Sequence, residues 1–263
     1  MGRGARELLF AAGDTRSSER LADKIRNGVK SLARAIGYDI RRIDSHFLKR
    51  PSDFIRSRNI DLVVDVGANT GQYAARLRGE GYAGWIVSAE PVSTVYAALA
   101  ARAAGDARWK TMNLAFGEKE GSADINVSEA SVLSSIRRQL PAAAAFNSEA
   151  RVIRHERVRV ARLDAVFPEL PTGRAFLKID TQGYEQQVLI GASGCLSRFM
   201  GVQMELPIVH LYEGTWQFHE AIAYMCDRGF EISNIVPVNY DRADSVSLVE
   251  VDCVFRVRRR QDA

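Results

Sequence analysis

The sequence predicts an α/β fold with a doubly wound, mostly parallel sheet that is covered by helices on both faces. Short apolar runs alternate with helix-compatible segments from residue 62 onward. The first apolar run stops at a glycine turn that leads directly into a helix, and the second run ends in a carboxylate. This order is typical of a sheet whose ligand binds at the carboxyl ends of the parallel strands.

Length and composition agree with this fold class. A chain of 263 residues can hold one large α/β domain with a short appendage. No apolar run reaches the length of about 18 residues that a membrane span needs, and no secretory signal is recognisable. The cysteines are far apart and fit reduced thiols better than disulfides or a zinc site, which favours a cytoplasmic protein.

Residues 1–50 are predicted to form a basic helical extension ahead of a domain over residues 51–263. The extension has a net charge of +6, whereas the remainder has −2. Apolar residues recur every three or four positions between residues 18 and 36, which predicts an amphipathic helix. Such a helix can pack on the domain or on a partner subunit of a homo-oligomer, or bind peripherally to an anionic membrane surface. Because the domain itself is not basic, nucleic acid is not expected as its substrate.

The first predicted strand, Leu62–Val66, ends at the turn Gly67-Ala68-Asn69-Thr70-Gly71, and a helix follows over residues 72–79. Glycine allows the backbone to turn sharply and to approach a ligand closely, and the new helix directs free N–H groups toward that ligand. A nucleotide-like cofactor is therefore the first hypothesis. The turn lacks both the G-x-G-x-x-G of dinucleotide-binding folds and the Gly-Lys-Ser/Thr of a P-loop. With Asp65 before it, it resembles the first motif of class I S-adenosylmethionine (SAM)-dependent methyltransferases.

The second predicted strand, Trp85–Ala89, is followed by Glu90, which lies 19 residues after Gly71. A carboxylate at this place can accept hydrogen bonds from ribose hydroxyls. Because NAD and SAM both carry a ribose, Glu90 supports an adenosine ligand without distinguishing between the two. The alternative is a solvated carboxylate in front of Pro91.

Beyond a helix over residues 94–103, a third strand is predicted over residues 109–116. Asn113 near its exit either touches the cofactor or shapes the turn at the strand end. Residues 118–160 contain a polar strand, a serine-rich segment and a half-exposed strand. We expect them to form an insertion that serves as a lid or as an acceptor-binding segment.

Two further strands are predicted to end in carboxylates. The first ends at Asp180, after which Gly183 turns the chain into a helix, and the second ends at Glu205. In an open α/β sheet both strand ends face the crevice that holds the glycine turn. The two carboxylates can bind a hard cation or one of them can accept a proton, unless they only cap helices and turns. His210 in the following loop is a candidate general base or a packed loop histidine.

The chain closes with a helix over residues 215–228 and two strands, over residues 230–238 and 247–257, which are expected to be an antiparallel pair. In this order the motifs resemble the FkbM-type methyltransferases over about residues 55–257. The matching segments are Asp65-Val-Gly-Ala-Asn-Thr-Gly71, Glu90-Pro91, Asn113-x-Ala115-x-Gly117, Arg162-Leu-Asp164, Leu177-Lys-Ile-Asp-Thr-Gln-Gly-Tyr-Glu185 and Val188-Leu-Ile-Gly-Ala192. Thr181-Gln182 departs from the family, which more often has a branched apolar residue and Glu there.

The resemblance implies a Rossmann-like class I fold, SAM as the cofactor, and O-methylation of a hydroxyl on a sugar, glycolipid or polyketide. It assigns these residues to the cofactor: Asp65, Gly67, Asn69, Gly71 and Glu90. It makes Asp180 and Glu205 candidates for base or metal ligand and His210 for base, with Mg²⁺ or another divalent cation suggested by analogy with cation-assisted O-methyltransferases. A nucleotide-dependent oxidoreductase and a non-catalytic SAM-fold binding module are the alternatives.

Overall fold

The computed structural model describes residues 28–29, 31–32, 35, 51–241 and 243–258. The chain divides into two compact units, residues 1–48 and 49–263. In the first unit the five described residues are helical, and Val29 and Leu32 are exposed. The rest of the helix predicted over residues 18–36 lies outside the described residues. Membrane contact and homo-oligomer formation through this segment therefore stay predictions.

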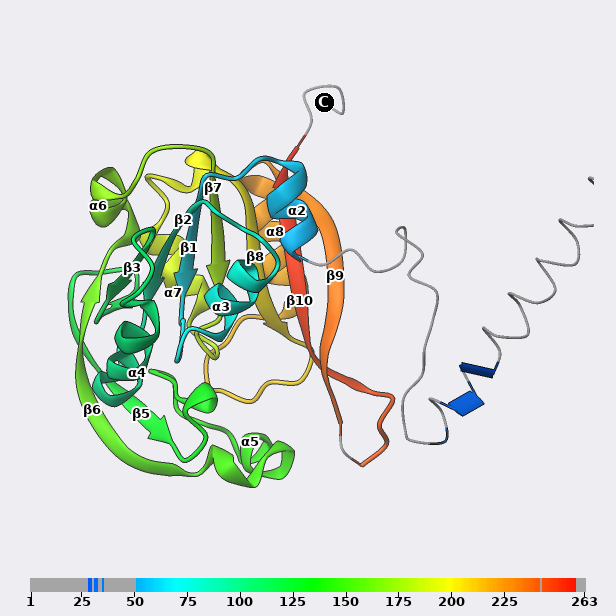
Figure 1. The fold of residues 1–263 in the computed structure, drawn as a ribbon. Helices are drawn as coiled ribbons and strands as arrows, with labels where there is room; N and C mark the ends of the chain where they lie inside the picture. Colours follow the sequence, from blue (N-terminus) through cyan, green and yellow to red (C-terminus); the bar gives the residue numbers. More distant parts are fainter. Residues whose placement is uncertain (1–27, 30, 33–34, 36–50, 242, 259–263) are drawn as a thin grey trace, which may run out of the picture. The chain divides into compact units, whose positions relative to one another are not determined.

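The second unit contains a seven-stranded sheet in the order β3-β2-β1-β7-β8-β10-β9 (Figure 1). Strands β3, β2, β1, β7 and β8 are parallel, and β10 is antiparallel to both β8 and β9. The doubly wound, mostly parallel sheet and its antiparallel terminal pair are thus confirmed. The strands are β1 (Leu62–Val66), β2 (Trp85–Ala89), β3 (Trp109–Met112), β7 (Ala175–Ile179), β8 (Phe199–Pro207), β9 (Phe230–Tyr240) and β10 (Leu248–Val257).

Helices cover both faces of the sheet because the side chains of each central strand alternate between two apolar layers. All five residues of β1 are buried. Its first, third and fifth residues pack in the cluster that contains Val188 and Met225, whereas Val63 packs with Ala74 and Leu99. The helices that supply these layers are α2 (Pro51–Ser57), α3 (Gln72–Gly79), α4 (Ser93–Ala103), α7 (Glu185–Gly191) and α8 (Phe218–Asp227).

The third strand differs from its prediction. It ends at Met112, and after the turn at Asn113 the chain enters β4 (Ala115–Phe116), which belongs to a separate three-stranded sheet in the order β4-β6-β5. The Asn113 amide explains the break, since its Nδ2 donates to the carbonyl oxygens of Glu90 at 2.9 Å and Pro91 at 3.0 Å. The side chain of Asn113 is exposed and holds the turn against the end of β2.

Residues 118–160, predicted as an insertion, supply most of this second sheet. They comprise β5 (Gly121–Ser128), the short 3₁₀ segment η1 (Ser131–Leu133), α5 (Pro141–Phe146), a second short 3₁₀ segment (Ser148–Ala150) and nearly all of β6 (Val152–Ala161). Apolar residues of β5 and β6 pack against Val92 and Val95 at the start of α4. Within the described part of the chain, no helix has the length and apolarity needed to cross a membrane.

Candidate functional site

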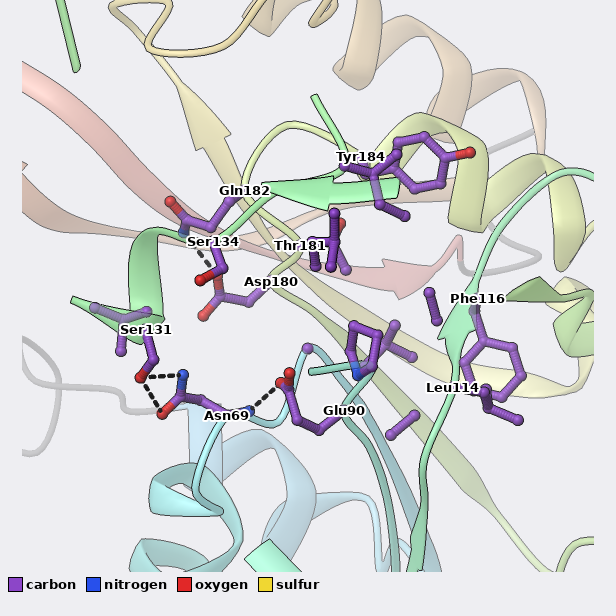
Figure 2. Close-up of a pocket in the computed structure, with 18 residues that line it drawn as sticks. Asn69, Glu90, Leu114, Phe116, Ser131, Ser134, Asp180, Thr181, Gln182 and Tyr184 are labelled. Atoms are coloured by element: carbon purple, nitrogen blue, oxygen red, sulfur yellow. Dashed lines mark hydrogen bonds between the residues drawn. The ribbon is translucent and has the colours of Figure 1, made fainter. Parts of the chain in front are cut away.

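A cleft lies at the carboxyl ends of β1, β2 and β7, where a doubly wound sheet binds its ligands (Figure 2). The space inside it amounts to about 630 Å³, open solvent at its mouth included. Of the residues predicted to form the site, four line the cleft: Gly67, Asn69, Glu90 and Asp180. The remaining walls come from Leu114, Phe116 and other apolar residues after β3, from the insertion, and from residues 181, 182 and 184.

The glycines of the turn are required by their backbone conformation and by the packing around them. Gly67 has φ +73°, and a Cβ there would lie 1.8 Å from the carbonyl oxygen of Asp180. Gly71 has φ +84°, and its Cβ would lie 2.8 Å from the Trp109 ring. Both positions therefore require glycine because of the protein's own packing. Asn69 between them also has a positive φ of 47°, which asparagine tolerates better than most residues.

Gly67→Ala is expected to destabilise the protein by at least ~2 kcal/mol, because the new methyl group meets a backbone oxygen in a left-handed conformation. Gly79→Ala is the matched control, since a Cβ on this last residue of α3 meets none of the described atoms within 4 Å. The control should leave the urea midpoint unchanged or raise it slightly. Equal midpoints for the two variants in urea unfolding would contradict the packing argument.

Glu90 is 6% exposed and is held by the backbone at both oxygens. Oε2 accepts a hydrogen bond from the Asn69 N–H at 2.9 Å, and Oε1 accepts one from the Val92 N–H at 2.9 Å. Burial raises the pKa of Glu90 to about 7, against the opposing effect of these two N–H donors. Each oxygen keeps a further lone pair, so the carboxylate can still accept hydrogen bonds from a ligand in the cleft.

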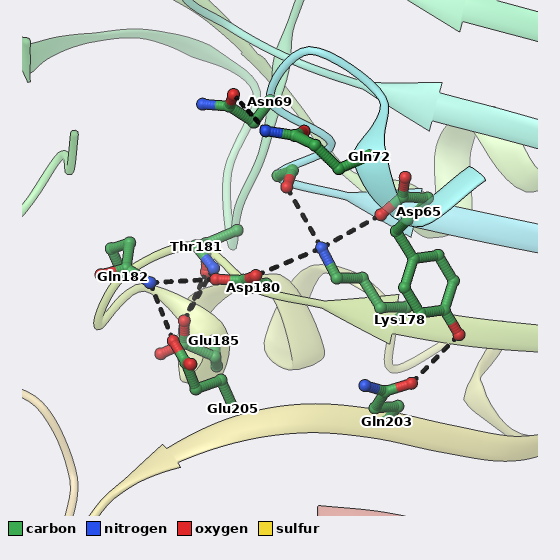
Figure 3. Close-up of polar contacts among 12 residues, drawn as sticks. Asp65, Asn69, Gln72, Lys178, Asp180, Thr181, Gln182, Glu185, Gln203 and Glu205 are labelled. Carbon is green, nitrogen blue, oxygen red and sulfur yellow. Dashed lines mark hydrogen bonds and ion pairs between the residues drawn. The ribbon is translucent and has the colours of Figure 1, made fainter. Parts of the chain in front are cut away.

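Asp65, which the resemblance assigned to the cofactor, lies below the turn instead of in the cleft lining. It is 0% exposed, and its Oδ1 lies 3.1 Å from Nζ of Lys178 (Figure 3). The same ammonium group donates to the carbonyl oxygen of Gly67 at 3.2 Å and lies 3.4 Å from Oδ2 of Asp180. Burial acts to lower the pKa of Lys178, but Asp65 and Asp180 outweigh it and raise that pKa. Lys178 therefore stays charged and joins the glycine turn to Asp180.

Lys178 was not predicted to belong to the site, although the sequence contains a signal for its role. It is the one charged residue of the five-residue apolar strand β7, whose other members are fully buried. A lysine in such a strand needs a carboxylate partner within reach. Asp65 occupies the directly paired position on β1, so the two side chains lie on the same face of the sheet.

Asp180 and Glu205 are brought together through Gln182 (Figure 3). The Gln182 Nε2 group donates to Oδ1 of Asp180 at 3.0 Å and to Oε2 of Glu205 at 2.8 Å, and Oε1 of Gln182 accepts a hydrogen bond from the Tyr212 hydroxyl at 2.8 Å. The prediction that Glu205 ends its strand is wrong. Strand β8 continues to Pro207, and Glu205 is paired with Asp252 of β10. It lines a smaller neighbouring cavity, not the main cleft.

The surroundings of Glu205 are acidic. Burial first, and then the nearby carboxylates of Asp180 and Glu250, raise the pKa of Glu205 well above its ordinary value. Burial also raises the pKa of Glu250 to about 7. Protonation of Glu205 relieves this repulsion.

His210 lies outside the cleft lining. Its Nδ1 is 3.0 Å from the Thr215 hydroxyl, and its buried Nε2 has no hydrogen-bond partner among the described residues. The His210–Thr215 contact lies within the loop, and His210 is not among the residues that line the cleft with Asp180 and Glu90.

Two serines of the serine-rich segment in the insertion bind the turns that border the cleft. The Asn69 Nδ2 group donates to the Ser131 hydroxyl at 3.0 Å, and the Ser135 hydroxyl donates to the carbonyl oxygen of Gln182 at 2.6 Å. The insertion therefore contacts the glycine turn and the turn after β7, which lie on two sides of the cleft. A role of the insertion as a lid or as an acceptor-binding segment stays a prediction.

Comparison with solved structures gives similarities at low sequence identity. A fibrillarin from Aeropyrum pernix, solved with natively bound S-adenosyl-L-methionine, is 14% identical with a TM-score of 0.45, over 74% of this chain and 66% of its own. An rRNA methylase from Streptococcus thermophilus is 12% identical with a TM-score of 0.43, over 81% of this chain and 99% of its own. TehB from Haemophilus influenzae is 9% identical with a TM-score of 0.44, over 78% and 60%. No curated protein sequence matches the chain significantly.

Family membership comes from the sequence model of the methyltransferase FkbM domain, which matches residues 65–232. The match begins at Asp65 before the glycine turn and includes Glu90, Lys178, Asp180 and Glu205. It spans well over half of the chain and agrees with the resemblance drawn from the motifs. The chain therefore belongs to the FkbM family of SAM-dependent methyltransferases.

Proposed function

We propose that the protein transfers the methyl group of SAM to a hydroxyl oxygen of a sugar, glycolipid or polyketide-like acceptor, with Asp180 as the general base. One observation carries the proposal: of the three candidate catalytic residues, Asp180 alone lines the cleft that also contains Glu90. Glu205 reaches this cleft only through Gln182, and His210 does not line it.

The polar and apolar residues of the cleft suit the ribose, the adenine ring and the sulfonium of SAM. Glu90 has free lone pairs for the ribose hydroxyls, and Pro91, Leu114 and Phe116 offer an apolar wall for the adenine ring. Among the described lining residues two are carboxylates and none is Lys or Arg. Such a lining favours a cationic sulfonium, whereas the pyrophosphate of NAD carries negative charge and would be repelled. This difference supports SAM over the oxidoreductase alternative.

Bound SAM supplies a methyl group that is already activated by the positive sulfur, so the protein must place the acceptor and remove one proton. Asp180 is oriented for this task by Lys178 at 3.4 Å and by the Gln182 amide at 3.0 Å. The acceptor hydroxyl loses its proton to Asp180 while its oxygen bonds to the methyl carbon and the carbon–sulfur bond breaks. The products are the methyl ether and S-adenosylhomocysteine.

A divalent cation does not fit the predicted ligands. The position between Asp180 and Glu205 is taken by the Gln182 amide, whose Nε2 donates to both carboxylates. In the part of the chain that the structure describes, no group of three or more His, Cys, Asp or Glu side chains has an arrangement suited to a metal ion. The proposed reaction therefore has no metal-dependent step, and we expect methyl transfer to continue in the presence of EDTA.

Replacing Glu90 by Gln should weaken SAM binding by about 10- to 100-fold, because a charged acceptor of ribose hydrogen bonds is lost. The raised pKa of about 7 also predicts a pH dependence: Glu90 is ionised above this pH and protonated below it. SAM affinity of the wild type should fall by up to roughly tenfold per pH unit below 7, and that of Glu90→Gln should not follow this course. Calorimetry across pH 5.5 to 8.5, roughly one to two units on each side, measures both effects.

Glu129→Gln is the control for this prediction, because Glu129 is an exposed carboxylate paired with Arg151 at 3.2 Å. It should bind SAM like the wild type. Equal SAM affinity for Glu90→Gln and Glu129→Gln at neutral pH would contradict a role of Glu90 in ribose binding.

The function itself is tested with labelled SAM and a pool of cellular glycans and lipids, analysed by mass spectrometry for added CH₂ groups. The proposal expects methyl ethers, with and without EDTA. SAM binding without any transfer would favour the non-catalytic binding module. Heat of binding with NAD but not with SAM in calorimetry would favour the oxidoreductase alternative.

A further inference from the structure

Arg137, in the insertion beside the cleft, is held in a fixed place by its backbone. It follows Ile136, which lines the cleft. Its N–H donates to the Ser135 hydroxyl at 2.9 Å, and its carbonyl oxygen accepts from the Asn126 amide at 2.9 Å. Because the Ser135 hydroxyl also binds the turn after β7, Arg137 is tied to the same part of the protein as Asp180.

The guanidinium group of Arg137 lies against the wall of the cleft. Its Cζ is 5.4 Å from the centre of the Tyr184 ring, and Tyr184 is a lining residue. On another side it approaches the loop at Gly214, where a Cβ would lie 3.1 Å from Nη1. A molecule that extends from the cleft past Tyr184 therefore meets this guanidinium group.

Within the described residues, this guanidinium group has no carboxylate partner and makes no hydrogen bond, and its Nε is buried. Other partly buried arginines each have a carboxylate partner, although Nε of Arg256 is also buried without a hydrogen bond. Arg78 reaches Asp106 at 2.6 Å, Arg162 reaches Asp164 at 2.5 Å and Arg256 reaches Glu231 at 2.6 Å. Arg137 is half-buried, and a buried N–H without an acceptor is costly, so an arginine with a buried free Nε–H and no carboxylate partner is a candidate for binding an external anion.

The chemistry of the Arg137 guanidinium group indicates the chemical class of its ligand. A guanidinium fork binds carboxylate or phosphate oxygens through two parallel hydrogen bonds. The main cleft next to it is lined by Glu90 and Asp180 and so suits a cation. The end of the site at Glu90 and Asp180 thus favours the positive charge of the sulfonium cofactor. The end at Arg137 favours a negative charge on the other substrate.

We propose that the acceptor carries an oxyanion, a carboxylate or a phosphate, which Arg137 binds and thereby aligns the acceptor hydroxyl with Asp180. The identity of the bound molecule as a methyl acceptor rests on the proposed function. The presence of an anion site at Arg137 does not, and the two are tested separately.

The anion site is tested by NMR on ¹⁵N-labelled wild-type protein saturated with S-adenosylhomocysteine. The Nε–H resonance of Arg137 is assigned by its absence from Arg137→Lys, and sodium phosphate or sodium acetate is added against sodium chloride of equal ionic strength. We expect a saturable shift of the Arg137 resonance with phosphate and acetate, and no such shift for Arg138, which is paired with Glu213. An unshifted Arg137 resonance, or one that moves equally with chloride, overturns the proposal.

The acceptor class is tested with labelled SAM and a glycan pool that is separated by anion exchange. We expect the labelled products in the retained, anionic fraction. Arg137→Gln should reduce that labelling by roughly 10- to 100-fold without a change in SAM affinity, and Arg137→Lys should restore part of it. Arg138→Gln, which removes the same charge one residue away, should label like the wild type. Labelled products confined to the neutral fraction, or equal labelling by Arg137→Gln and the wild type, overturn the proposal.

The two tests separate the failure of each idea. If the wild type labels no fraction at all, the proposed function fails, and the NMR titration alone decides the anion site. If labelling occurs but phosphate and acetate do not shift the Arg137 resonance, the proposed methyl transfer is supported and the proposed role of Arg137 is wrong.

Discussion

Asp180→Asn is expected to lower kcat for methyl transfer by about 10²- to 10⁴-fold, the range that a positioned general base contributes. Asparagine keeps the shape of the side chain, and its Oδ1 can still accept the hydrogen bond from the Gln182 amide. It cannot accept a proton from the acceptor hydroxyl, and it loses the ion pair with Lys178. Single-turnover measurement of labelled methyl ether formation isolates this step from product release.

The control variants for this prediction are the two other candidate bases. Glu205→Gln should reduce kcat far less than Asp180→Asn, because Glu205 contacts the cleft only through Gln182. His210→Asn should leave kcat near that of the wild type, because His210 lies outside the cleft lining. A larger loss for either of them than for Asp180→Asn would assign the base to that residue instead. SAM affinity must be measured for all three so that a loss of binding is not taken for a loss of chemistry.

Local sequence patterns were enough to predict the elements on which the site is built. Strands β1 and β2 and helix α3 lie where their patterns predicted them. A short β-branched run followed by a glycine turn leaves few other local structures. The third strand was predicted too long, because hydrophobicity continues through residue 116 while the Asn113 amide bonds the end of β2 and breaks the strand.

The polar connections of the site were not predictable in the same way. Gln182 joins Asp180 to Glu205 and to Tyr212. These two residues follow Gln182 in the chain by 23 and 30 positions. Ser131 reaches Asn69 across 62 residues. Such contacts depend on the register of strands and on the course of loops, for which one sequence gives no periodic signal. The carboxylates of the site could therefore be predicted from the sequence, whereas the long-range contacts of Gln182 and Ser131 could not.

The departure at Gln182 from the residue more common in the family has a physical consequence. A glutamate at this position would place a third carboxylate between Asp180 and Glu205, whereas the amide donates to both. Gln182 has a positive φ of 55° and lines both the cleft and the smaller cavity. A neutral donor in this position compensates the acidic surroundings without a cation, which agrees with the absence of a metal step in the proposed reaction.

Lys178→Met is expected to destabilise the protein by ~3–5 kcal/mol, the cost of leaving a buried charge without its partner. Asp65 is 0% exposed, and without the ammonium group its one remaining side-chain partner among the described residues is the Ser88 hydroxyl at 3.3 Å. The carbonyl oxygen of Gly67 and the Asp180 carboxylate lose a donor as well. Equilibrium unfolding in urea measures the loss.

Lys110→Met provides the matched control, because Lys110 is an exposed residue of β3 whose ammonium group lies 5.3 Å from the centre of the Trp85 ring. It should change the free energy of unfolding by less than ~1 kcal/mol. The double variant Lys178→Met with Asp65→Leu should recover much of the stability lost by Lys178→Met, since both buried charges are then gone. A loss below ~1 kcal/mol for Lys178→Met, or no recovery in the double variant, would contradict the view that this ion pair holds the glycine turn to the strand that carries Asp180.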